Sequence, residues 1–471
     1  MSNLIELLNQ NFPYTPTKGQ EETFNLLSKF IQDKEEEKPT FLLKGYAGTG
    51  KTTLISSVVK ALRYVTFKYQ LLAPTGRAAK VMSSYAKRKA FTIHKIIYKP
   101  EEDNTSGYIR FVRQSNTHKK TIFIVDEASM VGHYGASSSR SLLAELISFV
   151  FENEEAGNKL ILVGDTAQLP PVHQTVSPAL DIDTLSNFGL SITATELHEV
   201  VRQEQDSGIL ANATQLREQI RKDSFGLKIS TKSYKDIYRM NDQKLEDGLR
   251  YAYNKFGIEN TCIVCRSNRE ATQFNKMIRS QIHMSEEEID AGDFLMIVKN
   301  NYHWLPPDSP SGFLANGEFV QIQRVNNIEE IHGFRFADLT LQMVDYPEHP
   351  AFEAKVHLNT LHSFKPNLST EEQEELFANV IQSYVQQQGS EQLKINEIIQ
   401  NDEYLNALQI KFAYALTCHK SQGGQWDAVF VNMGFIKEEM YNIEWLRWLY
   451  TAFTRATTEL YLVNFLPQFF R

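Results

Sequence analysis

Cysteine and long apolar segments are scarce in this chain, and positive charge does not predominate. Only three of the 471 residues are cysteine, which argues against the disulfide framework of a secreted protein. No apolar run approaches the roughly 20 residues that a helix needs to cross a bilayer. The first residues, MSNLIE, lack a basic segment followed by an apolar core, so we expect no signal peptide. These absences favour a cytoplasmic protein with no membrane contact.

The formal net charge is −8, which taken alone argues against a nucleic-acid-binding protein. Residues 73–100 differ from the rest, because they contain seven basic residues and no Asp or Glu. A basic segment in an acidic chain indicates one surface that faces a polyanion. The alternative is an ordinary solvated helix face. The chain is long enough for two to four domains.

Residues 45–52, GYAGTGKT, fit the phosphate-binding pattern G-x-x-x-x-G-K-[ST]. The apolar residues 41–43 precede them as a buried strand should, and residues 53–62 follow with helical spacing. The loop amides and the helix N-terminus are therefore predicted to hold phosphates. We expect Lys51 to reach the β- and γ-phosphates of ATP and the hydroxyl of Thr52 to bind Mg²⁺. The other predicted nucleotide-contacting residues of this loop are Gly45, Ala47, Gly48, Thr49, Gly50 and Thr53.

Two carboxylates end the apolar strand predicted at residues 121–125. Ligands bind at the carboxyl ends of strands in open α/β sheets. We expect Asp126 to hold Mg²⁺ and Glu127 to act as the general base on the attacking water. Gln168 follows another buried strand, and we expect it to sense the γ-phosphate or orient that water. Arg202 and Arg455 are candidates for a positive charge on the γ-phosphate, Arg455 across a domain cleft.

Several polar residues early in the chain are candidates for further contacts. The side-chain amide of Gln20 can donate and accept at once, as an adenine edge requires. Near the basic segment, the candidates for contacts with phosphate or sugar are Thr75, Arg77, Lys80, Thr92 and His94.

Eight motifs follow one another in this sequence: GYAGTGKTT, APTGRAAK, TIHK, VDEASM, GDTAQLPPV, VVRQ, TCHKSQG and YTAFTRA. In residue type and order they resemble the motifs of superfamily 1B helicases, the 5′-to-3′ branch that includes the RecD-like and Dda-like proteins. The resemblance extends from Gln20 to Arg455. It implies that Gln20 reads adenine and that Gln168 couples the nucleotide state to DNA. It also places Thr75, His94, Thr417, His419 and Lys420 along single-stranded DNA.

The resemblance implies an α/β fold with two RecA-like P-loop domains. A small β-hairpin insertion is expected in the first domain, where residues 99–120 lose apolar periodicity, and this hairpin would split the duplex. An SH3-like β-barrel insertion is expected in the second, where residues 293–345 have strand patterns and the turn signal Asn316-Gly317. The predicted bounds are 1–190 for the first domain, 191–292 with 410–471 for the second, and 293–409 for the barrel with a helical excursion.

The expected function is an ATP-dependent DNA helicase of replication, repair or recombination. We expect it to be a monomer that moves 5′ to 3′ on single-stranded DNA and opens tailed duplex DNA. One alternative is a translocase that remodels protein–DNA complexes without separating strands. Another is a nucleic-acid-binding module whose ATP site is only a structural switch. A small-molecule kinase is disfavoured, because a second RecA-like half and a basic segment are surplus to its chemistry.

Overall fold

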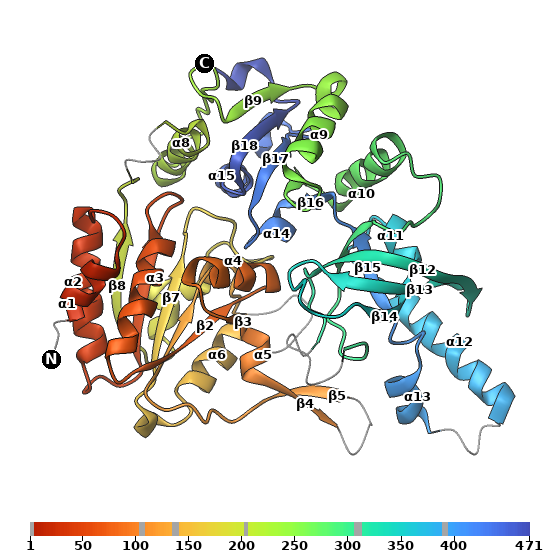
Figure 1. The fold of residues 1–471 in the computed structure, drawn as a ribbon, viewed down its shortest axis with the longest axis horizontal. Helices are drawn as coiled ribbons and strands as arrows, with labels where there is room; N and C mark the ends of the chain where they lie inside the picture. The colour runs from red at the N-terminus through yellow and green to blue at the C-terminus, as the bar shows by residue number, and fades with distance from the viewer. Residues whose placement is uncertain (1–3, 103–108, 134–140, 202–205, 306–312, 389–393) are drawn as a thin grey trace.

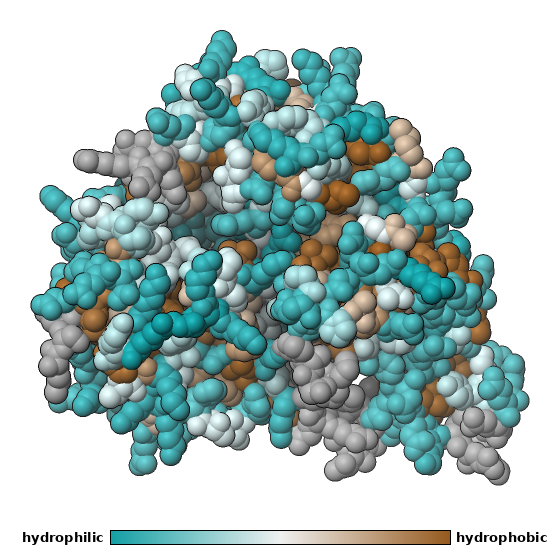
Figure 2. Space-filling view, viewed as in Figure 1, coloured by the Kyte–Doolittle hydropathy of each residue, from teal (hydrophilic) through white to brown (hydrophobic). Residues whose placement is uncertain are grey.

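The computed structural model describes residues 4–102, 109–133, 141–201, 206–305, 313–388 and 394–471. Figure 1 shows three parts: a first α/β layer built from the N-terminal half, a second built from the middle and the C-terminal end, and a β-barrel beside both. In the part of the chain that is described, no helix has the length and apolar character needed to cross a membrane. The face shown in Figure 2 is mostly hydrophilic, with hydrophobic side chains in scattered clusters.

The first sheet has six parallel strands in the order β3-β2-β6-β7-β1-β8. Side chains alternate between its two faces. Phe41 and Leu43 belong to one buried cluster, whereas Leu42 belongs to another. Helices therefore cover both faces, as parallel sheets require. The strands are β1 (Pro39–Gly45), β2 (Lys68–Ala73), β3 (Ala90–Thr92), β6 (Thr121–Val125), β7 (Lys159–Gly164) and β8 (Ser191–Leu197).

Among the described residues, seven α-helices accompany this sheet. They are α1 (Leu4–Asn11), α2 (Lys18–Gln32), α3 (Lys51–Ala61), α4 (Gly76–Ala86), α5 (Ile93–Ile97), α6 (Leu142–Val150) and α7 (Ile182–Ser186). A two-stranded hairpin of β4 (Tyr98–Glu102) and β5 (Ile109–Arg113) follows α5 and projects from the layer. This is the expected hairpin insertion.

The second sheet has five parallel strands in the order β16-β10-β17-β18-β9. Its strands are β9 (Ile237–Met240), β10 (Thr261–Cys265), β16 (Ala415–Thr417), β17 (Trp426–Asn432) and β18 (Ala456–Val463). Its helices are α8 (Gly208–Lys222), α9 (Asp242–Phe256), α10 (Asn268–Met277), α14 (Cys418–Ser421) and α15 (Ile443–Phe453). The sheet thus combines strands from before and after the barrel.

The barrel closes through β11 (Phe294–Ile297), β12 (Phe319–Ile331), β13 (Phe334–Met343), β14 (Phe352–His357) and β15 (Leu408–Phe412). Between the last two strands lie α11 (Asn359–His362), α12 (Thr370–Gln388) and α13 (Ile395–Asn401), the expected helical excursion. The fold class expected from the sequence, two P-loop-type α/β layers with a hairpin and a barrel insertion, is therefore confirmed.

Two predicted boundaries need correction. The first domain was expected to end at residue 190, but β8 pairs along the whole of β1 and belongs to the first sheet. This edge strand is only partly buried and has no apolar run to mark it. The second domain was expected to resume at residue 410, but β15 pairs with β11 and β14 in the barrel. One almost continuous apolar segment supplies both β15 and β16, so its pattern does not show where the barrel ends.

Candidate nucleotide cleft and strand channel

The loop of residues 45–52 joins β1 to α3, as its sequence predicts. Gly48 and Gly50 have φ of 75° and 82°, a backbone region that glycine enters without strain. Gly50 is the N-cap of α3. The ammonium of Lys51 donates to the carbonyl oxygens of Gly45 (2.6 Å) and Tyr46 (2.9 Å), so the loop curls around this side chain.

A cavity of about 480 Å³ opens beside this loop, between the two α/β layers. The first layer contributes Lys51, Thr52, Asp126 and Glu127, among others, and the second contributes Arg455. Five more residues that the sequence predicts near the nucleotide also line this cavity: Ala47, Gly48, Gly50, Thr53 and Gln168. The cleft therefore collects most of the residues predicted to contact a nucleotide.

The two adjacent carboxylates lie at the end of β6. Asp126 accepts from the amide of Glu127 through Oδ1 (2.8 Å) and from the hydroxyl of Tyr85 through Oδ2. Burial raises the pKa of Asp126, and the nearby charge of Glu127 raises it further. A cation at this position would favour the ionised carboxylate. Thr52 and Asp126 together offer the oxygen ligands that Mg²⁺ prefers.

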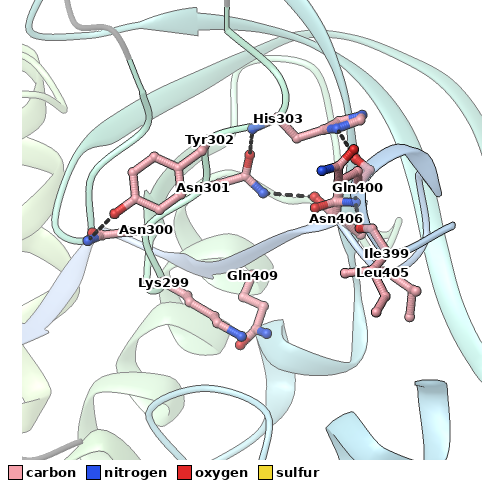
Figure 3. Close-up of a pocket in the computed structure, with 11 residues that line it drawn as sticks. Lys299, Asn300, Asn301, Tyr302, His303, Ile399, Gln400, Leu405, Asn406 and Gln409 are labelled. Atoms are coloured by element: carbon pink, nitrogen blue, oxygen red, sulfur yellow. Dashed lines mark hydrogen bonds between the residues drawn. The ribbon is translucent and has the colours of Figure 1, made fainter. Parts of the chain in front are cut away.

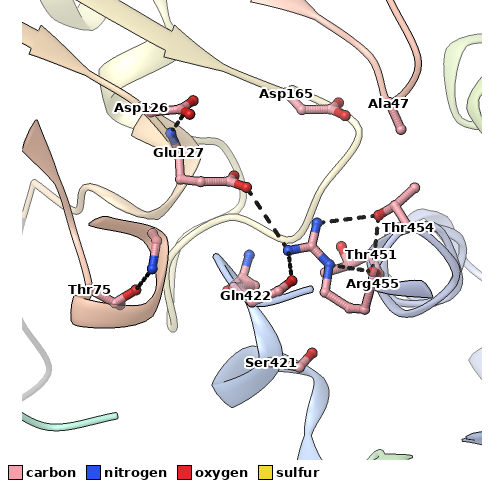
Figure 4. Close-up of polar contacts among 12 residues, drawn as sticks. Ala47, Thr75, Asp126, Glu127, Asp165, Ser421, Gln422, Thr451, Thr454 and Arg455 are labelled. Atoms are coloured by element: carbon pink, nitrogen blue, oxygen red, sulfur yellow. Dashed lines mark hydrogen bonds and ion pairs between the residues drawn. The ribbon is translucent and has the colours of Figure 1, made fainter. Parts of the chain in front are cut away.

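Arg455 reaches the cleft from the loop that follows α15 (Figure 4). Its side chain is 3% exposed and donates to the carbonyl oxygens of Thr451 and Gly424, each at 3.1 Å. Nη1 of Arg455 lies 4.0 Å from Oε1 of Glu127. A cation from one layer thus faces the predicted general base of the other. Arg202, the second predicted arginine, lies outside the described residues.

The two glutamines predicted near the nucleotide differ in their surroundings. Oε1 of Gln168 is buried without a hydrogen-bond partner, and this residue lines the cavity. Gln20, in contrast, has both ends of its amide bonded to the protein. Its Oε1 accepts from the amide of Thr17 (3.0 Å), and its Nε2 donates to the carbonyl of Thr49 (3.0 Å). In this structure Gln20 caps α2 and supports the phosphate-binding loop from behind.

A second cavity, of about 440 Å³, lies where the first layer, the second layer and the barrel meet. We call it the strand channel. Six of the predicted DNA-contacting residues line it: Thr75, Arg77, Thr92, His94, His419 and Lys420. Lys80 and Thr417 are not among its lining residues. Sequence reasoning missed the barrel side, which contributes Asn300, Phe313, Asn316 and Phe319. Asn316 had been noticed only as a turn residue.

Hydrogen bonds fix several channel residues. The hydroxyls of Thr75 and Thr92 accept from backbone amides in the first turns of α4 and α5. The ammonium of Lys420 donates to Oδ1 of Asn316, which joins the second layer to the barrel. Burial lowers the pKa of Lys420 to about 8 and also lowers the pKa of His94 and of His419. Burial therefore disfavours the charged forms of these three side chains in the free protein.

Arg77 and Lys80 are paired within the protein. Both approach Oδ1 of Asp345, which follows β13 in the barrel, at 3.5 Å and 3.1 Å. The guanidinium of Arg77 also lies over the rings of Phe319 (5.0 Å) and Trp426 (4.7 Å). Arg77 thus contacts the barrel and the second layer from α4 of the first. We call this contact the three-way joint.

A smaller cavity of about 180 Å³ separates the barrel from α13 (Figure 3). Several side chains beside it donate to backbone carbonyls of the opposite wall. The side chains of Asn301 and Trp304 both donate to the carbonyl of Asn406, each at 2.8 Å. Asn300 lines this cavity and the strand channel, and its Oδ1 accepts from the amide of Asn316 (2.7 Å). Asn300 therefore supports the turn that faces the channel.

Comparison with known proteins gives matches to both layers. A family described as AAA domain matches residues 30–232, and one described as UvrD-like helicase C-terminal domain matches residues 412–463. An uncharacterized protein, R530 of Acanthamoeba polyphaga mimivirus, is 25% identical over 94% of this chain and 98% of its own length. The ATP-dependent RecD2 DNA helicase of Deinococcus radiodurans is 33% identical over 28% of this chain and 16% of its own length.

Among solved structures, one chain from a structure of two coordinating Pif1 helicases at forked double-stranded DNA is similar. The alignment covers 97% of this chain and 94% of that one, with a TM-score of 0.50 and 16% sequence identity. At that identity the likeness concerns the fold, which includes both layers and the barrel.

Proposed function

We propose that this chain is an ATP-dependent DNA helicase of superfamily 1B, similar to the RecD-like and Dda-like proteins. It moves 5′ to 3′ along single-stranded DNA and separates the strands of a tailed duplex. The position of Arg455 opposite Glu127 carries this proposal, because it allows a nucleotide to be held and hydrolysed between two layers that also wall the strand channel.

The chemistry of ATP hydrolysis is assigned to residues of the nucleotide cleft. The loop amides and Lys51 bind the phosphates, and Thr52 and Asp126 would hold Mg²⁺, which neutralises phosphate charge. Glu127 takes a proton from the attacking water. Gln168, whose Oε1 has no partner, orients that water or senses the γ-phosphate. Arg455 stabilises charge on the transferring group, and Arg202 is proposed to join it.

DNA is assigned to the strand channel. Thr75, Thr92, His94, His419 and Lys420 would contact the sugar-phosphate backbone. Such contacts are independent of sequence and weaken as salt rises. Because the two layers wall both the cleft and the channel, a change in their separation during hydrolysis would move one wall of the channel relative to the other. The hairpin of β4 and β5 is proposed to divide the duplex ahead.

The test is steady-state ATP turnover with and without single-stranded DNA, beside unwinding of matched duplexes with a 5′ or a 3′ tail. Strong stimulation and opening of only the 5′-tailed duplex are expected. Stimulation without unwinding would favour the translocase that remodels protein–DNA complexes. ATP turnover that is the same with and without single-stranded DNA would overturn the assignment of the strand channel.

A further inference from the structure

Tyr450 reaches the phosphate-binding loop from the opposite layer. It lies on α15, and its side chain is 1% exposed. Its hydroxyl donates to Oδ2 of Asp165 (2.6 Å) and accepts from the backbone amide of Ala47 (2.8 Å). Asp165 follows β7, and both it and Ala47 line the nucleotide cleft. One hydroxyl therefore joins the second layer to two separate segments of the first.

The segment after Asp165 is held from the second layer as well. The hydroxyl of Thr451 accepts from the amide of Leu169 (2.9 Å), and Nε2 of Gln422 donates to the carbonyl of Leu169 (2.7 Å). Gln168 lies between these contacts and that of Tyr450. Figure 4 shows Asp165 and Ala47 on one side of the cleft and Thr451 with Gln422 on the other. Residues on both sides of Gln168 are thus bonded to the second layer.

A neighbouring contact acts on the same loop. The guanidinium of Arg217, on α8, lies 4.4 Å from the centre of the Tyr46 ring. Tyr46 and Ala47 are consecutive, so two second-layer side chains contact adjacent residues of the phosphate-binding loop. The ring of Tyr46 provides the surface for this contact.

We propose that Tyr450 is a positioning residue that couples closure of the cleft to the geometry of the phosphate-binding loop, an inference that rests on the proposed function. The hydroxyl has one proton, which is directed to Asp165, so a lone pair remains for the amide of Ala47. Both bonds require α15 to lie against the first layer. When the cleft opens, both bonds break together, and the loop and Asp165 lose their alignment for hydrolysis.

The experiment compares Tyr450→Phe with Tyr461→Phe in the full chain. The first variant keeps the ring and removes the hydroxyl at the cleft. The second removes a buried hydroxyl of the same layer that bonds to Glu459, outside the cleft. For Tyr450→Phe we expect kcat for ATP, with and without single-stranded DNA, to fall roughly tenfold, as the loss of one hydrogen bond with a buried partner implies. The KM for ATP, the affinity for single-stranded DNA and the thermal midpoint should change little, and Tyr461→Phe should keep wild-type kcat.

The pH profile of kcat gives a readout that a merely structural role would not move. Burial raises the pKa of Asp165, whereas the charge of Lys51 and the hydrogen bond from Tyr450 oppose that rise; Glu127 adds to it. Removing the hydroxyl deletes one opposing cause, so the pKa of Asp165 rises further. The acidic limb of the profile should therefore move to higher pH in Tyr450→Phe and stay in place in Tyr461→Phe.

The outcomes separate this inference from the proposed function. Wild-type kcat and an unshifted acidic limb in Tyr450→Phe would overturn the role of Tyr450, and so would an equal loss in both variants. A lower thermal midpoint together with lost DNA binding would also overturn it, because the residue would then be structural. Failure of DNA to stimulate the wild type would instead remove the proposed function, while turnover without DNA would still decide the role of Tyr450.

Discussion

Nη1 of Arg455 and Oε1 of Glu127 lie 4.0 Å apart, although they come from opposite layers. The guanidinium is held by two backbone carbonyls, so its position follows the end of α15. Arg455→Lys keeps a positive charge but loses the planar fork that makes these contacts. We expect ATP turnover to fall on the order of 10³-fold, the lower range for a lost arginine finger. DNA binding should persist, and Arg250→Lys on α9 is the control. Near-normal turnover in Arg455→Lys would mean that another residue supplies the positive charge at the γ-phosphate.

Glu127→Gln tests the general base. The amide has the size of the carboxylate but accepts no proton from water, so turnover should drop by about 10² to 10⁴. Nucleotide binding, followed with a fluorescent ATP analogue, should stay within a few-fold of wild type. Glu154→Gln, at an exposed position that does not line the cleft, should leave turnover unchanged. If Glu127→Gln turns over ATP normally, another group must activate the water.

Lys51→Ala removes the cation that the phosphate-binding loop encloses. We expect ATP turnover to be lost, because no other side chain of the loop offers a charge to the β- and γ-phosphates. The affinity for single-stranded DNA should remain largely intact, since Lys51 does not line the strand channel. Turnover assays and fluorescence anisotropy measure the two effects, and retained turnover would refute the phosphate-binding assignment.

Lys420 predicts how DNA binding depends on pH. Burial lowers its pKa to about 8, so the free protein loses this charge as pH rises through that value. A phosphate favours the charged form, so affinity for single-stranded DNA should be constant below about pH 8 and fall as the pH rises above it, which is below the usual titration of lysine. Lys420→Arg keeps its charge over this range and should bind with less pH dependence. Equal pH dependence in both proteins would contradict the assignment of Lys420.

At the three-way joint, we expect the loss of Arg77 and the loss of Lys80 to lower the free energy of unfolding by different amounts. The side chain of Arg77 is 12% exposed and that of Lys80 is 43% exposed, while that of their shared partner Asp345 is 2% exposed. Breaking a buried pair is costly, so Arg77→Ala should lower the free energy of unfolding by about 2 to 3 kcal/mol. Lys80→Ala should lower it by about 1 kcal/mol or less. Urea denaturation measures both, and equal losses would contradict this account of the joint.

The features that the sequence predicted correctly are those that depend on residues close together in the chain. The phosphate-binding loop is determined by its own glycines and by the helix that follows, so Lys51 and Thr52 could be located from eight residues. The pairing of Arg77 with Asp345 could not be found this way, because the two lie 268 residues apart. Basic side chains near a motif were therefore assigned to DNA, although the barrel supplies a buried carboxylate for them.

Gln20 was assigned to adenine, although the local sequence also contains a helix-capping pattern that explains its position. Thr17 and Gln20 form a capping box, a pattern of Ser or Thr followed three residues later by Glu or Gln. That pattern accounts for the carbonyl end of the amide without any ligand. Contact between Gln20 and adenine stays a prediction, and it would require Nε2 to leave the carbonyl of Thr49.

The strand order of the two sheets has a consequence for synthesis on the ribosome. All six strands of the first sheet are complete once residue 197 has been made, so that layer can fold while the rest of the chain is still missing. In the second sheet β9 pairs with β18, and these strands begin at residues 237 and 456. The edge of β9 must therefore wait, unpaired, until almost the whole chain has emerged. Unpaired strand edges promote aggregation, so the second layer is where slow or interrupted translation would do most harm.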